Sequence, residues 1–300
     1  MRRLGDVLKE QYGEKVYKLS LSSGCTCPNR DGTLGFGGCS FCSQGGSGDF
    51  AAAPAPLEEQ LREAKARISG KTSARRFIAY FQSFTNTYGD PGRLEALYAD
   101  ALSREEIVAL SLGTRPDCLG EDILAMLCRL QRIKPVWLEL GLQTIHEDSA
   151  RRIRRGYPLQ VFEESYARVK ALGFPVVVHV IFGLPGESRE QMLDTVRYLA
   201  ALSPPPDGVK LQMLHVLRDT ALGEEYELCP FPLLSMEEYA NLVAESLAIL
   251  PEETVIHRLT GDGPGKLLLA PDWTRNKKRV LNAIQRAIRN REANREANIN

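Results

Sequence analysis

The sequence predicts an α/β fold in which repeated βα units surround a parallel sheet. Short runs rich in β-branched or aromatic residues alternate about six times with amphipathic segments, which is typical of consecutive βα units. The chain has 300 residues, 43% of them hydrophobic, enough to bury one large core or one core with a small appendage. A glycine-rich stretch that holds four of the seven cysteines follows the first strand and must be a loop.

The predicted elements follow one another closely. Residues 1–14 form a short leader helix. Strands are expected at 15–21, 76–81, 107–112, 136–140, 175–182 and 208–214, and helices between them at 57–68, 94–102, 122–130, 159–172 and 190–202. After Pro230 the regular alternation of strands and helices ends, and we expect a helix at 236–250, a strand at 254–257 and a helix at 277–288. We therefore expect one βα domain over 15–230, a C-terminal extension over 231–288 and a frayed, disordered polar tail over 289–300.

The 38 basic and 38 acidic residues balance, so the net charge does not indicate binding to nucleic acid or to a membrane surface. Basic residues still gather at Arg151–Arg155 and along a tail from Arg275 to Arg295. The first group is either a solvated helix face or a site for a substrate phosphate. No apolar run reaches the roughly 20 residues of a bilayer span, and the N-terminus lacks a signal peptide. We expect a soluble, cytoplasmic protein without a membrane partner.

The cysteine-rich stretch from Gly24 to Phe50 carries eight glycines. Within it, Cys27, Cys39 and Cys42 have the spacing Cys-x11-Cys-x2-Cys. Three thiolates on a four-iron cluster leave one iron open to a substrate or cofactor. Addition of Cys25 makes four thiolates, which suit a closed structural zinc site. The composition alone leaves iron and zinc equally open, although an odd number of cysteines favours metal or redox ligands over disulfides.

The residues around these cysteines resemble a known family. The block Cys27-Pro-Asn-Arg-Asp-Gly-Thr-x-Gly-x-Gly-Gly-Cys39-x-Phe-Cys42 is similar to the cluster loop of the YhcC-type radical S-adenosylmethionine (SAM) enzymes, which resemble the radical domain of the Elongator catalytic subunit. The similarity covers roughly residues 10 to 288. It continues through Tyr-Phe-Gln-Ser-Phe-Thr-Asn-Thr-Tyr at 80–88, Gly-Thr-Arg-Pro-Asp-Cys at 113–118, Trp-Leu-Glu-Leu-Gly-Leu-Gln at 137–143, His-Val-Ile-Phe-Gly-Leu-Pro-Gly-Glu at 179–187, His-Val at 215–216 and His-Arg-Leu-Thr-Gly-Asp at 257–262.

This resemblance implies a partial, six-stranded (β/α) barrel of the TIM type with a C-terminal extension that caps it. It also implies a [4Fe-4S] cluster on Cys27, Cys39 and Cys42, with SAM at the open iron and an electron donor such as flavodoxin or ferredoxin. The sequence departs from the family pattern twice. Cys25 stands where the family usually has another residue, so we leave it off the ligand list, and Tyr157 replaces the usual histidine, so it carries little weight.

Further residues are expected to bind SAM. Gly45, Gly46, Ser47, Gly48 and Asp49 match the family's glycine-rich segment, whose carbonyls hold the SAM amino group; a flexible turn is the alternative. Residues just beyond the strands' carboxyl ends line the active sites of βα barrels, and Thr114 and Arg115 follow the third strand there. Glu139 and Gln143 lie at the end of the fourth strand, His179 lies on the fifth, and Gly183 follows the fifth. The resemblance implies that Glu139 or Gln143 binds the ribose or methionine end, and that Gly183 begins the segment receiving adenine. The alternatives are a surface turn, a paired buried carboxylate and a core histidine.

Three hypotheses about the substrate stay open. The resemblance favours a radical SAM enzyme that converts the 5-carboxymethylaminomethyl group of a tRNA wobble uridine to 5-aminomethyl, with Tyr80, Phe81 and Tyr88 available to stack on anticodon bases. The second is a radical SAM enzyme on a small molecule or peptide. The third is a zinc-stapled RNA-binding or adaptor protein without catalysis.

Overall fold

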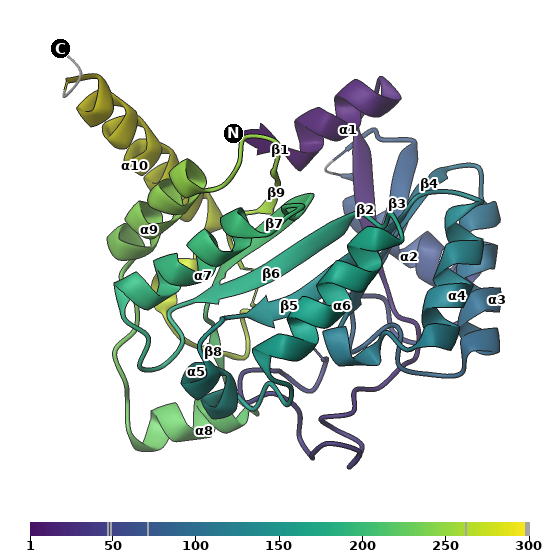
Figure 1. Cartoon of the computed structure of the whole chain (residues 1–300), viewed down its shortest axis with the longest axis horizontal. Coiled ribbons are helices and arrows are strands. Elements are labelled where there is room, and N and C mark those ends of the chain that lie inside the picture. The colour runs from purple at the N-terminus through teal and green to yellow at the C-terminus, as the bar shows by residue number, and fades with distance from the viewer. Residues whose placement is uncertain (47, 49, 71, 262, 298–300) are drawn as a thin grey trace.

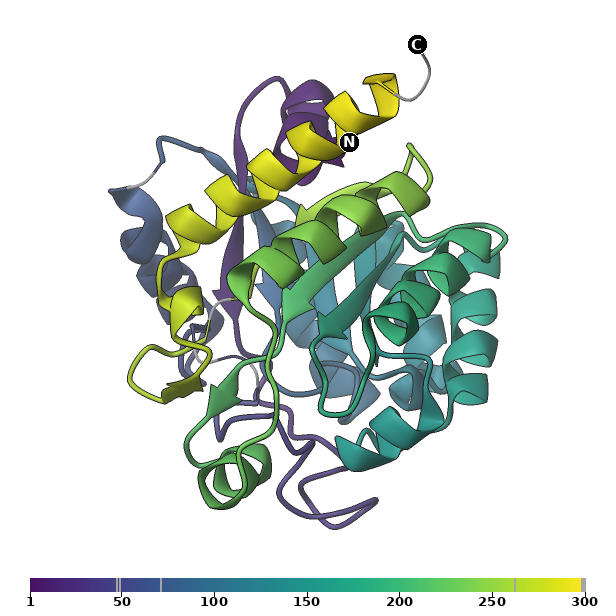
Figure 2. The ribbon, with the colours of Figure 1, turned by 90° about the vertical axis from the view of Figure 1, so that its left-hand side faces the viewer.

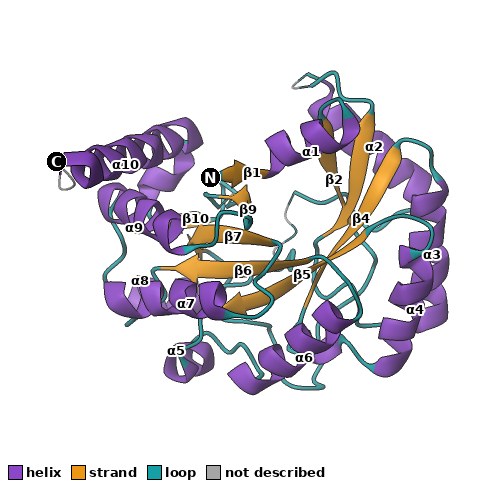
Figure 3. Ribbon diagram, turned by 45° about the horizontal axis from the view of Figure 1, so that its top comes forward, coloured by secondary structure: helices purple, strands orange, loops and turns teal. Residues whose placement is uncertain are grey.

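The computed structural model describes residues 1–297 except 47, 49, 71 and 262. Its centre is an eight-stranded parallel sheet with the order β1-β9-β7-β6-β5-β4-β3-β2, which curls into an open half-barrel (Figure 3). The strands are β1 (Arg2–Arg3), β2 (Val16–Leu21), β3 (Arg76–Phe81), β4 (Ile107–Thr114), β5 (Val136–Gln143), β6 (Val176–Phe182), β7 (Gly208–Met213) and β9 (Val255–Arg258). Two short strands, β8 (Val216–Leu217) and β10 (Leu268–Ala270), form a separate antiparallel pair.

Helices surround the half-barrel, some on its outer face and others at its two ends (Figure 1). They are α1 (Leu4–Tyr12), α2 (Leu57–Ser69), α3 (Pro91–Ser103), α4 (Glu121–Gln131), α5 (Glu147–Arg152), α6 (Leu159–Ala171), α7 (Arg189–Ala201), α8 (Ala221–Leu228), α9 (Met236–Ile249) and α10 (Lys277–Ala297). The apolar faces of α3, α4, α6, α7 and α9 bury residues such as Tyr98, Leu127, Phe162, Val196 and Tyr239 against the sheet in one core. In the part of the chain described here, no helix has the length and apolar character to cross a bilayer.

The six predicted barrel strands are confirmed as β2 to β7, with ends that differ by at most three residues. The predicted strand at 254–257 is β9, which continues the same sheet by pairing parallel to β7. Helix α10 continues to Ala297, whereas the sequence analysis expects a frayed tail from residue 289. The Arg-Glu-Ala-Asn repeats there contain mostly good helix formers, which allows this extension.

The interior of the half-barrel is closed at one end by α1. Leu8 of this helix packs with Val16, Ile78 and Ala109, residues near the amino ends of three neighbouring strands, and Trp137 lies against them. Because side chains alternate along a strand, the next inward positions belong to Lys18, Tyr80, Ser111 and Glu139. An apolar plug therefore lies directly beneath a polar layer.

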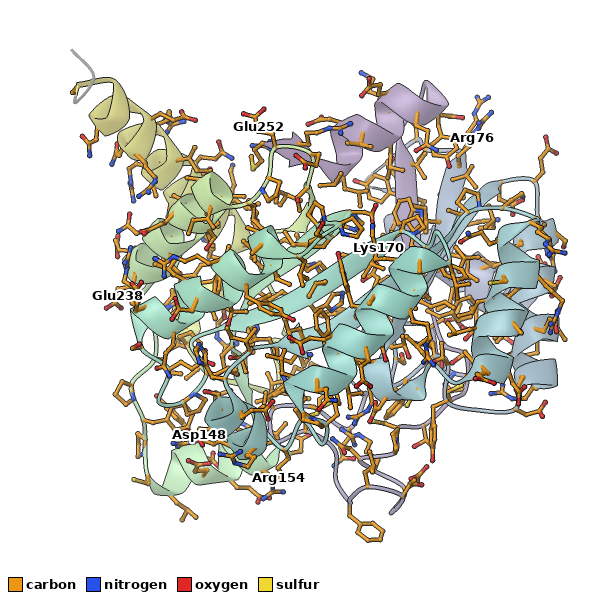
Figure 4. The ribbon with its side chains drawn as sticks, viewed as in Figure 1. Arg76, Asp148, Arg154, Lys170, Glu238 and Glu252 are labelled. Carbon is orange, nitrogen blue, oxygen red and sulfur yellow. The ribbon has the colours of Figure 1, made fainter. Side chains whose placement is uncertain are left out.

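The opposite end of the half-barrel is an open mouth formed by the long loops. Figure 2 shows the dark purple loop that follows β2 at this end, together with α5 and α8, while α1 lies at the other end. Asp148 on α5 and Arg154 just after this helix lie at the same loop-bearing end in Figure 4. In parallel βα sheets the carboxyl ends of the strands are where ligands bind, so this mouth is where the site is built.

Candidate active site

The loop between β2 and α2 is tied across the mouth of the half-barrel. The Nδ2 atom of Asn29 donates hydrogen bonds to the carbonyl oxygens of Arg154 (2.8 Å) and Arg155 (3.1 Å). Further along the loop, the backbone amide of Ser40 donates to the carbonyl oxygen of Ile153 at 2.9 Å. The segment that follows α5 therefore holds two points of the cysteine loop.

Cys27, Cys39 and Cys42 line one cavity of about 1060 Å³, which occupies the interior of the half-barrel. None of these three described cysteines is in a disulfide bond. Burial, and then the charges of neighbouring Cys42 and Cys27, raise the pKa of Cys39 to about 12. A bound metal would favour the thiolate form of Cys39, because a coordinating thiol is deprotonated. Thiolate ligands of this kind suit an iron–sulfur cluster.

Cys25 lies apart from the other three. Its side chain is buried, its Sγ atom accepts a hydrogen bond from Arg93 Nη2 at 3.3 Å, and it does not line the cavity. Across the described residues, no three His, Cys, Asp or Glu side chains are placed to hold a single metal ion. A cluster places each thiolate on a different iron and tolerates a wider separation. The position of Cys25 outside the cavity therefore favours a three-thiolate site over a four-thiolate zinc site.

Arg115 adds a fixed positive charge beside the thiols. Its guanidinium makes a bidentate pair with Asp117, with Nε–Oδ1 and Nη2–Oδ2 distances of 2.9 and 2.7 Å, and Nη1 donates to the carbonyl oxygen of Arg155 at 2.8 Å. Burial would lower the pKa of Arg115, but Asp117, Cys27 and Cys39 outweigh it and raise this pKa. Arg115 and its neighbour Thr114 both line the cavity, as the sequence analysis expects.

The glycine-rich segment after Cys42 is packed tightly against the end of β3. A Cβ atom on Gly46 would come within 2.4 Å of the Phe84 ring, and one on Gly48 would come within 2.0 Å of Ser83 Oγ. The carbonyl oxygen of Gly46 accepts a hydrogen bond from the Phe84 amide at 2.9 Å, and Gly45 O accepts one from Gly48 N at 3.0 Å. Gly46 lines the cavity, whereas Gly45 and Gly48 do not. Ser47 and Asp49, also predicted to bind SAM, lie outside the described residues.

Glu139 lies deep inside the half-barrel. Its carboxylate accepts a hydrogen bond from Ser111 Oγ at 2.6 Å and one from His179 Nε2 at 2.7 Å, and pairs with Lys18 and Lys210. Burial alone would raise the pKa of Glu139, but the two lysines outweigh it and hold this pKa well below its usual range. Burial and the charge of Lys210 lower the pKa of His179 to about 4, so its imidazole is neutral at neutral pH.

The remaining predicted SAM-binding residues divide between the cavity and its surroundings. Gln143 ends β5 with a positive φ of 68° and lines the cavity about four residues, roughly 13 Å, above Glu139. Gly183 does not line the cavity. It has a φ of 84°, its amide points at the Met192 sulfur, and a Cβ there would meet Leu234 at 3.3 Å. Gly183 therefore serves the packing of the β6–α7 connection.

The basic residues at Arg151–Arg155 have two different environments in the structure. Arg155 is buried and donates to the carbonyl oxygens of Leu142 and Thr144, so it fixes the end of β5. Arg151 and Arg152 are exposed on α5 and pair with Asp148 and Glu225. Part of this group is thus a solvated helix face, as one alternative expects, and part is a buried structural element that the sequence analysis missed.

Lys18 on β2 and Lys210 on β7 line the cavity but were not predicted as site residues. Tyr80 on β3 was considered only for base stacking, and it also lines the cavity. Lys210 Nζ donates to Tyr80 OH at 2.9 Å, and both lysine ammonium groups lie over the Tyr80 ring, at 4.7 Å for Lys18 and 4.4 Å for Lys210. Lys210 could have been found from the sequence as the one charged residue of the strand Gly-Val-Lys-Leu-Gln-Met.

Two family models match the chain over most of its length. The model described as the Radical SAM superfamily matches residues 24–199, and the Radical_SAM C-terminal domain matches residues 206–290. The chain belongs to the radical SAM superfamily. The C-terminal model begins inside the range 15–230 predicted for the βα domain, and it includes β7 and β9, which pair in one sheet.

The relatives of this radical SAM protein include uncharacterised bacterial proteins. It is 40% identical to the uncharacterised protein YtqA of Bacillus subtilis, over 95% of this chain and 88% of that protein. It is 36% identical to the protein YhcC of Escherichia coli, over 91% and 87% of the two chains. Elongator complex protein 3 of Danio rerio is 32% identical over 58% of this chain and 31% of its own length. These identities make it a YhcC-type member related to the Elongator protein.

Among solved structures, the archaeal Elp3 of Methanocaldococcus infernus has the same fold. The two superimpose with a TM-score of 0.64 at 18% sequence identity, over 85% of this chain and 58% of that one. The expectation of a radical SAM partial barrel is confirmed by this similarity and by the curled parallel sheet.

Radical SAM enzymes use a [4Fe-4S] cluster and SAM, so this chain is an enzyme with these cofactors, and the alternative of a non-catalytic zinc protein is set aside. When bound, the two cofactors supply a 5′-deoxyadenosyl radical that abstracts a hydrogen atom. The residues present fit them. Three cysteine thiols line one cavity, the buried Arg115 lies beside them, and Gly46 of the glycine-rich segment lines the same cavity.

Proposed function

We propose that this enzyme binds its cluster through Cys27, Cys39 and Cys42 and modifies a side chain on the wobble uridine of a tRNA. The reaction would take a hydrogen atom and then one electron from the carbon between the nitrogen and the carboxylate of 5-carboxymethylaminomethyl-uridine, the electron passing to a one-electron acceptor of the iron–sulfur class. Water would then hydrolyse the resulting imine, which releases the two-carbon unit as glyoxylate and leaves 5-aminomethyl-uridine. The observation that carries the proposal is the placement of the three cysteines on the wall of a deep cavity that is closed below and open towards the loops. A slender group can enter such a cavity while the rest of a large substrate stays outside.

The similarity to Elongator complex protein 3 supports an RNA substrate, and the mouth of the cavity has suitable side chains. Phe36, at the tip of the cysteine loop, is 79% exposed. Phe50 is 50% exposed and also lines the cavity. Exposed aromatic rings bind unstacked bases of single-stranded RNA. We therefore assign base stacking to these two rings.

Two of the aromatic residues considered for stacking in the sequence analysis are unsuitable. Phe81 is fully buried and packs edge-on against Tyr98 at a ring distance of 4.9 Å. Tyr80 faces the interior of the half-barrel, where its hydroxyl accepts from Lys210. Neither side chain can reach a base held at the mouth. Tyr88 remains near the mouth, with its hydroxyl 2.8 Å from Thr33 Oγ1 on the cysteine loop.

The decisive experiment compares modified nucleosides in tRNA from cells with and without the gene. Loss of the enzyme should cause 5-carboxymethylaminomethyl-uridine to accumulate at the expense of its 5-aminomethyl product. In vitro, anaerobically reconstituted enzyme with SAM and a reductant should form 5′-deoxyadenosine together with the product nucleoside. Unchanged nucleoside profiles together with no turnover of that RNA would rule the tRNA proposal out.

A small-molecule or peptide substrate is the second candidate. The cavity of about 1060 Å³ is slightly larger than typical small-ligand pockets of roughly 300–1,000 Å³, so it has room for such a substrate. Salt-sensitive binding to tRNA separates the two, because phosphate contacts weaken as salt rises. We expect such binding if the substrate is tRNA and none if it is a small molecule. In either case a flavodoxin- or ferredoxin-like donor would deliver the electron.

A further inference from the structure

The floor of the cavity is a ring of polar side chains that come from five strands. Lys18, Tyr80, Glu139, His179 and Lys210 occupy inward positions of β2, β3, β5, β6 and β7, and all five line the cavity. Beneath them is the apolar plug made by α1 and the amino ends of the strands. This plug closes the floor from below.

The hydrogen bonds of the floor leave donors, not acceptors, for a ligand. Glu139 accepts from four groups, namely Ser111, Lys18, His179 and Lys210, which fills the roughly four acceptor positions of a carboxylate. An ammonium group has three N–H donors. Among the described residues, Lys210 donates to Tyr80 and Glu139, and Lys18 donates to Glu139 and, at 3.4 Å, to Ser111. Each lysine thus keeps one N–H for the cavity.

The charges of the floor point the same way. Between about pH 4 and pH 7, where Lys210 is protonated and His179 is neutral, two ammonium groups share one carboxylate, and Ser111 and Tyr80 are uncharged. Lys18 and Lys210 belong to β2 and β7, which are separated by the whole width of the half-barrel, yet both reach Glu139. A pair of converging cations with an uncompensated charge in a desolvated place binds an anion well.

We propose that Lys18 and Lys210 bind the terminal carboxylate of the substrate side chain. This inference rests on the proposed function, since 5-carboxymethylaminomethyl-uridine ends in such a carboxylate. Its two oxygens can each accept one of the remaining ammonium N–H groups. The carbon next to that carboxylate would then lie above the floor, between the lysines and the thiol-bearing wall. Anchoring the far end of the group holds the reacting carbon in one position, which is how an enzyme makes hydrogen abstraction selective.

The phosphate backbone of an RNA is excluded as the anion by the same geometry. Glu139 lies about 13 Å below Gln143 along β5, and Gln143 is the last residue of that strand. A polynucleotide backbone at the mouth cannot descend to this depth, whereas an extended substituent on a base can. A free carboxylate metabolite is the other source of the same chemical group, and the experiment below separates the two.

The test uses reconstituted enzyme with SAM and two anticodon stem-loop RNAs, one with 5-carboxymethylaminomethyl-uridine and one with 5-methylaminomethyl-uridine. Fluorescence anisotropy measures both affinities under anaerobic conditions. Wild-type enzyme should bind the carboxylate-bearing RNA at least about tenfold more tightly. Lys18→Met and Lys210→Met should each lose this preference, while Lys9→Met, which removes an exposed charge on α1, should keep it. Equal binding of the two RNAs by the wild-type enzyme would overturn the proposal, whether or not the lysine variants fold.

A second arm distinguishes failure of this inference from failure of the proposed function. If the wild-type enzyme binds neither RNA, the tRNA assignment falls, and free N-methylglycine then tests the floor alone. A rise in the melting temperature of the wild type with millimolar N-methylglycine, absent in Lys210→Met, would support a carboxylate site for a small substrate. No rise in either protein would refute the site.

Discussion

Lys210 on β7 donates a 2.9 Å hydrogen bond to the hydroxyl of Tyr80 on β3, across the interior of the half-barrel. The two strands are separated by β4, β5 and β6 in the sheet, so only the curvature of the sheet brings these residues together. The same ammonium group pairs with Glu139. One buried carboxylate therefore connects strands from both sides of the half-barrel.

Glu139→Gln should lower the free energy of unfolding by about 3–5 kcal/mol at pH 7, because it leaves two buried ammonium groups without a counter-charge. The amide oxygen of the glutamine can still accept a hydrogen bond from one lysine. Its NH₂ group is a donor and cannot accept a hydrogen bond from the other lysine. Urea denaturation of the two proteins measures the difference. A variant as stable as the wild type would show that the lysines reach water or other partners when Glu139 loses its charge.

The pH dependence of that loss has a definite sign. Glu139 has a depressed pKa in the folded protein, so its contribution is present above pH 4.5, near the pKa of an unperturbed glutamate, and is lost as the pH falls towards the folded value. The cost of Glu139→Gln should therefore shrink in acid. It should also shrink above pH 7, because burial lowers the pKa of Lys210 to about 7 despite the opposing effect of Glu139. Unfolding measured from pH 4 to pH 9 should show the largest difference near neutrality.

Carboxylate binding should take up a proton above pH 7. The groups facing Lys210 in the empty floor are Lys18, Tyr80, Glu139, His179, His257 and Arg258, and burial together with the other cations lowers the pKa of Lys210 to about 7. An added anion favours the ammonium form and raises this pKa again. At pH 8, calorimetric titration of the carboxylate-bearing RNA in buffers of different ionisation enthalpy should show net proton uptake. Lys210→Met should show much less, and equal uptake by both proteins would assign the proton to another group.

Cys27→Ala, Cys39→Ala and Cys42→Ala should each abolish formation of 5′-deoxyadenosine, because two thiolates cannot fix a cluster with a single open iron. Cys25→Ala is the matched control. Its thiol accepts from Arg93 and lies outside the cavity, so the variant should keep its brown colour and about four irons. Iron analysis and the visible spectrum of anaerobically purified proteins check both statements. Loss of colour in Cys25→Ala would place that thiol among the ligands.

Gly48→Ala should impair cluster binding. The added Cβ would lie 2.7 Å from the Ser83 Cα atom, a backbone atom that cannot move aside without disturbing the turn after β3. The segment after Cys42 would have to shift, and the iron content after reconstitution should fall several-fold. Gly70→Ala is the control, because nothing lies within 4 Å of its Cβ and its φ of −75° suits alanine. Full iron content in Gly48→Ala would mean that the loop adapts more easily than its packing indicates.

The strands and the cysteine loop could be predicted from the sequence for clear physical reasons. A run such as Val-Val-Val-His-Val-Ile has high β propensity and is long enough for one strand, and eight glycines near four cysteines do not fit a packed element. Helix α5 and strand β8 were missed because six and two residues are too short to show a period. The end of α10 was missed because polar repeats are typical of both tails and exposed helices.

The floor of the cavity could be predicted only in part. Glu139 and His179 stood out as polar residues within apolar strands. Lys18 did not, because β2 alternates Val-Tyr-Lys-Leu-Ser-Leu and a lysine there reads as solvent-facing. Whether an inward position of β2 faces one of β7 depends on the curvature and register of the whole sheet. No local pattern in the sequence contains that information.

Phe36→Ala should weaken binding of the anticodon stem-loop by about 1–3 kcal/mol, or roughly 5- to 150-fold, if the ring stacks on one base. The ring is 79% exposed and the short bridge between Asp31 and Phe36 belongs to the backbone, so truncation of the side chain should not unfold the loop. Ile133→Ala is the matched control, since Ile133 is 53% exposed just before β5 begins, at the end of the half-barrel opposite the mouth. Anisotropy titrations at two salt concentrations separate stacking from phosphate contacts, because the loss on truncation of Phe36 should be the same at both. If Phe36→Ala and Ile133→Ala bind the RNA alike, the tip of the cysteine loop does not contact a base, and the substrate must approach the mouth from another side.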